Sequence, residues 1–65
     1  MNTNERRWLI ETLVHDYEHD LMEQPATDSE KYAELTTYRH SLYNLGAADL
    51  LETYENWYSS KYETN

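Results

Sequence analysis

The 65-residue sequence contains no cysteine and no phenylalanine, and it has only one glycine and one proline. Without cysteine there is no disulfide framework and no thiolate metal site. A domain of this length buries only about 60% of the surface that its unfolded chain exposes. Because no disulfide can support so small a core, we predict a single domain over residues 1–65 that is stabilised as a homodimer.

Basic residues and long apolar runs are also scarce. The chain lacks the run of about 18 apolar residues that a membrane span requires. Residues 1–7 lack the apolar segment of a signal peptide, so we expect a cytoplasmic protein. Five Lys and Arg residues stand against 13 Asp and Glu residues, for a formal net charge of −8. Nucleic-acid binders neutralise phosphates with Lys and Arg, so we predict no direct binding to DNA or RNA.

Signals for β-structure are missing as well. The chain has one valine, one isoleucine, no Asn-Gly or Asp-Gly turn, and no stretch of alternating polar and apolar residues. Apolar residues instead recur at three- and four-residue steps, which is the spacing of one face of an α-helix. We therefore predict an all-α fold.

A first helix is predicted from about residue 4 to residue 24. Its apolar positions are Ile10, Leu13, Val14, Tyr17 and Leu21. Side-chain oxygens in residues 2–4 can cap its start. Pro25 prevents its continuation, because proline lacks an amide hydrogen and crowds the preceding turn.

A second helix is predicted over about residues 28–45. Thr27 and Glu30 form the T-x-x-E pattern of a helix-capping box. The apolar positions that follow are Leu35, Tyr38, Leu42 and Leu45. Gly46 then stands where a residue in the left-handed conformation commonly ends a helix.

Beyond Gly46 the apolar stripe moves around the helix axis. A continuing helix would place the charged residues Asp49 and Glu52 on the stripe. A new stripe instead begins roughly 160° away, formed by Ala47, Leu50, Leu51, Tyr54 and Tyr58. We predict a turn at Gly46 and a third helix over about residues 48–62, packed across the antiparallel hairpin of the first two. The alternative is one long helix with a glycine inside it.

The third helix is rich in aromatic residues. Tyrosine and tryptophan rings suit half-buried positions, because the polar end of each ring needs water or a partner. We predict a self-association seam at Tyr54, Trp57 and Tyr58; the alternative is that these rings form the core of a monomer. Trp8 lies roughly opposite the apolar stripe of the first helix. It is either covered by the third helix or the tail, or it anchors a protein interface.

Acidic residues concentrate between Asp16 and Glu34, where seven carboxylates stand against Lys31 alone. A helical hairpin gathers these residues at its closed end. Carboxylates in the last turns of the first helix oppose its dipole, so this surface serves either solubility or a cationic partner. The candidate partner-binding residues are Asp16, Glu18, Asp20, Glu23 and Glu34, with Trp8 or a neighbouring tyrosine as the apolar anchor.

The string from His15 to His19 matches the H-x-x-E-H pattern of inverted zinc proteases. Those enzymes need a further ligand on a much larger fold, so we interpret both histidines as surface residues rather than as a bridging metal site. The chain contains no nucleophile with a neighbouring base, no phosphate-binding glycine loop and no paired-carboxylate cleft. We predict no enzyme activity, no cofactor and no metal site.

These features favour a small acidic inhibitor or regulator that binds a basic protein. Carboxylates on successive helical turns can imitate the phosphates of nucleic acid, a strategy of small acidic inhibitors from phages and mobile elements. The expected partner is a basic protein that handles nucleic acid. The alternative is a helical adaptor or antitoxin-like module that captures a partner helix on its Tyr, Leu and Trp faces.

Overall fold

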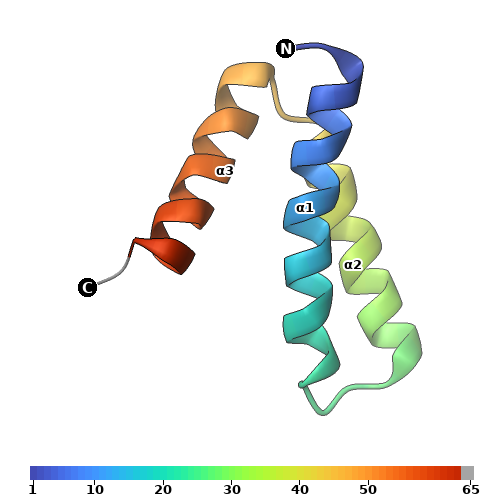
Figure 1. Cartoon of the computed structure of the whole chain (residues 1–65). Coiled ribbons are helices and arrows are strands. Elements are labelled where there is room, and N and C mark those ends of the chain that lie inside the picture. Colours follow the sequence, from blue (N-terminus) through green and yellow to red (C-terminus); the bar gives the residue numbers. More distant parts are fainter. Residues whose placement is uncertain (64–65) are drawn as a thin grey trace.

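The computed structural model describes residues 1–63 as three helices joined by short loops (Figure 1). The helices are α1 (Thr3–Met22), α2 (Asp28–Tyr43) and α3 (Ala47–Tyr62). No strand occurs in this range, so the all-α prediction is confirmed. α1 and α2 each end two residues before their predicted limits of 24 and 45. α2 and α3 are separate, so the alternative of one long helix is wrong.

Side chains cap the first two helices at the positions that the sequence indicated. The Asn2 side chain accepts a hydrogen bond from the Glu5 amide at 2.8 Å, and the Thr27 hydroxyl accepts one from the Glu30 amide at 3.2 Å. Each cap satisfies an amide that has no partner inside its helix. The starts of α1 and α2 therefore follow from local sequence alone.

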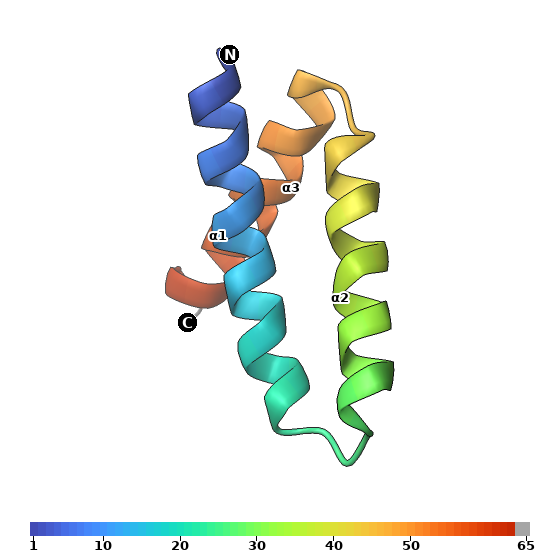
Figure 2. The ribbon, with the colours of Figure 1, turned by 90° about the vertical axis from the view of Figure 1, so that its right-hand side faces the viewer.

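The core is centred on α1. Four of its buried residues come from this helix, and α2 and α3 each supply one: Leu9, Ile10, Leu13, Val14, Leu42 and Leu50. α1 packs against both other helices, whereas α2 and α3 make few contacts with each other. Figure 2 shows α1 and α2 side by side, with α3 behind α1. The molecule is consequently flat, measuring 35 × 32 × 16 Å.

Two arginines form hydrogen bonds between α1 and α2 or the loop that follows α2. The Arg39 guanidinium donates two hydrogen bonds of 3.2 Å to the Glu11 carboxylate, an arrangement that fixes both side chains. The Arg6 guanidinium donates to the main-chain oxygens of Tyr43, at 2.9 Å, and of Leu45. These oxygens lie at the end of α2, where helical carbonyls lack partners within the helix.

The conformation predicted for Gly46 is wrong. Its φ is −69°, and it is the N-cap of α3 rather than a left-handed residue that ends α2. α2 ends in ordinary right-handed geometry, because the Asn44 amide bonds to the His40 oxygen and the Leu45 amide to the Leu42 oxygen. Arg6 covers the neighbouring carbonyls, so α2 needs no left-handed residue.

Replacing Gly46 should stabilise the protein. Gly46 gives α3 no side-chain cap, and a Cβ at this position would meet nothing within 4 Å. Gly46→Ser should raise the free energy of unfolding by about 0.5–1 kcal/mol, through a new cap and a less flexible unfolded chain. Urea unfolding followed by circular dichroism measures the change. Gly46→Ala, which adds no cap, should gain less; an equal gain from both would show that the cap contributes nothing.

The attachment of α3 should depend on Leu50, the one residue of this helix that is buried. Leu50→Ala should lower the free energy of unfolding by about 2–5 kcal/mol, because it leaves a cavity in the core. Met22→Ala is the control, since Met22 is exposed and its loss should change stability by less than about 0.5 kcal/mol. Similar losses in both variants would contradict this description of the core.

Candidate protein-binding surface

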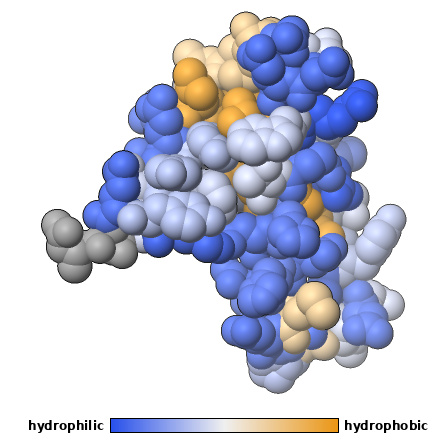
Figure 3. Space-filling view, viewed as in Figure 1, coloured by the Kyte–Doolittle hydropathy of each residue, from blue (hydrophilic) through white to orange (hydrophobic). Residues whose placement is uncertain are grey.

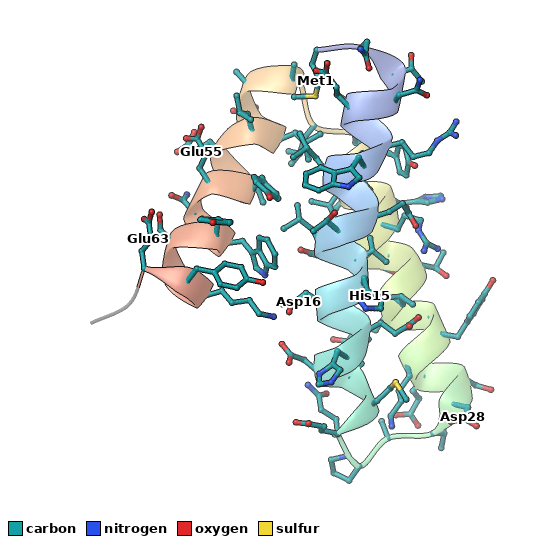
Figure 4. The ribbon with its side chains drawn as sticks, in the orientation of Figure 1. Met1, His15, Asp16, Asp28, Glu55 and Glu63 are labelled. Atoms are coloured by element: carbon teal, nitrogen blue, oxygen red, sulfur yellow. The ribbon has the colours of Figure 1, made fainter. Side chains whose placement is uncertain are left out.

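The closed end of the α1–α2 hairpin presents exposed carboxylates from both helices. The last turns of α1 and the first turns of α2 meet there across the short loop (Figure 1). Asp28 marks this end in Figure 4. We call the following exposed residues the acidic end: Glu18, Asp20, Glu23, Asp28, Glu30 and Glu34.

Lys31 lies among the six carboxylates of the acidic end, but no ion pair within residues 1–63 involves any of them. Within residues 1–63 the ion pairs are Arg39 with Glu11 and Lys61 with Asp16, both outside this group. Lys31 is the basic residue nearest in sequence, and its ammonium donates to the Met22 carbonyl oxygen at 3.3 Å. The acidic end therefore keeps an excess of negative charge that faces solvent.

Asp16 lies apart from the acidic end and joins α1 to α3. Figure 4 shows its side chain directed toward α3. Its carboxylate accepts a hydrogen bond from the Trp57 indole nitrogen at 2.9 Å and a second from the Lys61 ammonium. The bonds from Lys61 and Trp57 hold the pKa of Asp16 below its ordinary value. With its charge paired and its side chain only 22% exposed, Asp16 adds little to the surface that a partner meets.

Glu34 is partly engaged within the protein. One of its carboxylate oxygens accepts a hydrogen bond from the Tyr17 hydroxyl at 2.8 Å, and this bond raises the pKa of Tyr17 above its ordinary value. The Tyr17 ring packs edge-on against Tyr38, with ring centres 4.2 Å apart. Glu34 remains exposed, and its other oxygen makes no hydrogen bond within residues 1–63.

Trp8 is only partly covered. Its ring lies 5.8 Å from that of Tyr54, so α3 packs on this face of α1, yet 59% of Trp8 stays exposed. Trp8 lines an open groove of about 620 Å³ between the starts of α1 and α3, together with Met1, Asn4, Glu5, Leu9 and Leu51. The groove is largely apolar.

The three residues predicted for self-association differ in their surroundings. Tyr54 and Trp57 are half-buried against the core, and Trp57 also binds Asp16. Tyr58 is exposed. The core of one chain thus half-buries two of the three rings, and the expected homodimer stays a prediction.

His15 and His19 are both exposed. They line a shallow hollow between α1 and α3 that also contains Asp16 and Lys61. No group of three or more His, Asp or Glu side chains within residues 1–63 is arranged so that it could hold a metal ion. Asp16, the carboxylate in this hollow, is bonded to Trp57 and Lys61 instead.

An apolar hollow adjoins the acidic end. Met22 and Tyr32 are 70% and 74% exposed, and they line this hollow with Glu18, Asp28 and Lys31. Neither residue belongs to the apolar stripe of its helix. Their position off the stripe is the feature of the sequence that indicates an outward-facing side chain. Exposed apolar side chains among carboxylates suit contact with a partner that is both basic and apolar.

Comparison with protein-family models, curated proteins and solved structures finds no match for this chain. Among the described residues, none of the helices has the length and apolar character needed to cross a membrane.

The Asp16 contacts should make stability depend on pH. Because the pKa of Asp16 is lowered in the folded protein, its pairing stabilises the fold above the ordinary aspartate pKa and is lost as the pH falls through the folded value. Asp16→Asn should cost about 1 kcal/mol in the free energy of unfolding at pH 7, and the cost should shrink below about pH 4. Urea unfolding over a pH series measures this.

Asp20→Asn is the matched control for this prediction. The Asp20 side chain is exposed and makes no hydrogen bond or ion pair within residues 1–63. Asp20→Asn should therefore leave the free energy of unfolding at pH 7 nearly unchanged. If the two variants behave alike at pH 7, the Asp16 contacts do not hold α3.

Proposed function

We propose that this protein is an acidic binding protein that inhibits or regulates a basic partner through the acidic end. The observation that supports the proposal is the exposed set of carboxylates that no cation of residues 1–63 pairs with. Carboxylates near the C-terminus of α1 also oppose the helix dipole, at a few tenths of a kcal/mol each. Such an arrangement lowers the stability of the isolated chain and favours contact with positive charge.

The proposed partner is a protein whose basic groove otherwise holds nucleic acid. Asp20 lies in the last turn of α1 and Glu23 is the C-cap of that helix, while Glu30 and Glu34 occupy adjacent turns of α2. Neighbours at these spacings lie about 5–6 Å apart, which is of the order of the phosphate spacing along a strand. Arg and Lys side chains of such a groove would pair with these rows, and nucleic acid would be excluded.

Met22 and Tyr32 give this surface an apolar contact that phosphates lack. Charge complementarity mainly speeds association, whereas buried aromatic and apolar contacts contribute most of the binding energy. We therefore expect a partner with an apolar side chain among its cations.

A capture experiment with two matched variants tests the proposal. The test variant is Glu18→Gln/Asp20→Asn/Glu23→Gln, and the control with the same change in charge is Asp49→Asn/Glu52→Gln/Glu63→Gln. Immobilised protein should retain basic nucleic-acid-binding proteins from a lysate of its source cells, and rising salt or added duplex DNA should release them. The test variant should weaken capture at least about tenfold and the control much less.

Two outcomes would contradict the proposal. Equal losses in both variants would show that total charge, not the acidic end, attracts the partner. Capture that resists salt but is lost in Trp8→Ala would instead support the adaptor alternative, in which apolar faces hold a partner helix.

A further inference from the structure

The face that α1 and α3 share leaves a continuous set of apolar and aromatic side chains uncovered. Trp8, Tyr54, Tyr58 and Tyr62 follow one another with ring centres 5.8, 6.2 and 4.8 Å apart. In Figure 3, orange and pale side chains gather over α3 and the start of α1, among blue surroundings. We call the exposed members of this set the aromatic face: Met1, Trp8, Leu51, Tyr58 and Tyr62.

The protein exposes more surface than a compact monomer of its mass. Its accessible surface is 4978 Å², whereas a compact monomer of 7.9 kDa exposes about 4,400 Å². The excess of about 600 Å² approaches the 800 Å² or so that each partner buries in a standard interface. This excess is summed over the whole surface of a flat molecule, and it is of the order that burial against a second copy would remove.

Charged residues of both signs border the aromatic face, and Glu5 lines its groove. Arg7 lies one turn after Asn4, which lines the groove. Among the lysine and arginine side chains of residues 1–63, that of Arg7 alone makes no hydrogen bond or ion pair. On α3, Glu55 lies between Leu51 and Tyr58 on one helical stripe. Under a two-fold axis that brings α1 of one copy against α3 of the other, Arg7 of each copy would face Glu55 of the other.

The aromatic face is also well placed for contact between like chains. Two copies that each carry a charge of −8 repel one another. The groove lies at the start of α1, at the opposite end of that helix from the acidic end (Figure 1). Contact there keeps the two acidic ends away from the seam.

From these observations we propose that the aromatic face is the interface of a homodimer. Each copy covers the Trp8 groove and the outer rings of α3 of the other. The seam therefore includes Tyr58 from the predicted set and adds Trp8 and Leu51, while Trp57 stays with Asp16 inside each chain. The dimer presents two acidic ends, and it forms without any partner.

Sedimentation equilibrium of the purified chain over a concentration series tests the dimer. The parent should associate to a dimer, and Leu51→Asp should raise its dissociation constant at least about tenfold by placing a carboxylate in the seam. Met22→Asp makes the same charge change at an exposed apolar residue outside the face and should behave like the parent. Salt should strengthen or preserve the dimer, because it screens repulsion between acidic chains.

The indole N–H signals in NMR spectra of the parent chain provide a test without any variant that disturbs folding. As concentration rises, the Trp8 signal should shift, whereas the Trp57 signal, bonded to Asp16, should shift much less. A parent that stays monomeric at all concentrations overturns the proposal, and so does equal weakening by Leu51→Asp and Met22→Asp. These measurements use the purified chain without a basic partner. The dimer should persist as salt rises, whereas capture of a basic partner should weaken. A failure of the dimer proposal can therefore be told apart from a failure of the proposed function.

Discussion

The fold depends on the burial of α1 between two helices that scarcely touch each other. Leu9, Ile10, Leu13 and Val14 form most of the core, and single residues of α2 and α3 complete it. Sharing one helix lets a short chain bury both flanks of α1. It also leaves α2 and α3 with faces that nothing within one chain covers, and this is the origin of the groove beside Trp8.

Electrostatics divides the molecule into two regions. Near the core, cations and carboxylates pair across helices, as Arg39 does with Glu11 and Lys61 with Asp16. At the acidic end, carboxylates meet without such partners and Lys31 binds a main-chain oxygen instead. An isolated protein would be more stable if each of these carboxylates were paired with a cation. The uneven distribution is the physical basis for proposing a cationic partner.

The contacts of the aromatic side chains account for the use of tyrosine and tryptophan in a chain without phenylalanine. The Trp57 indole bonds to Asp16 and the Tyr17 hydroxyl bonds to Glu34, while their rings contact other rings. Each of these side chains joins apolar packing to a polar contact at the edge of a small core. The same amphipathic character lets Trp8, Tyr58 and Tyr62 remain exposed in a single chain and still suit an interface.

Local signals in the sequence were sufficient for the helices and for the closed end. The Thr27 cap acts within three residues of itself, Pro25 acts on the preceding turn, and a hairpin with a short loop necessarily gathers its last and first turns. The sequence also determined that the carboxylates of residues 18–34 outnumber the cations near them. Helical periodicity gives the direction in which each of these side chains points.

Only the tertiary structure decided which side chains meet. Asp16 looked like a member of the acidic surface, but it binds Trp57 and Lys61, 41 and 45 residues further along the chain. The sequence predicts the turn at Gly46 but the wrong conformation for it, because Arg6, from near the start of the chain, covers the carbonyls at the end of α2. Periodicity specifies a direction in space, whereas the neighbour found there depends on how distant segments pack.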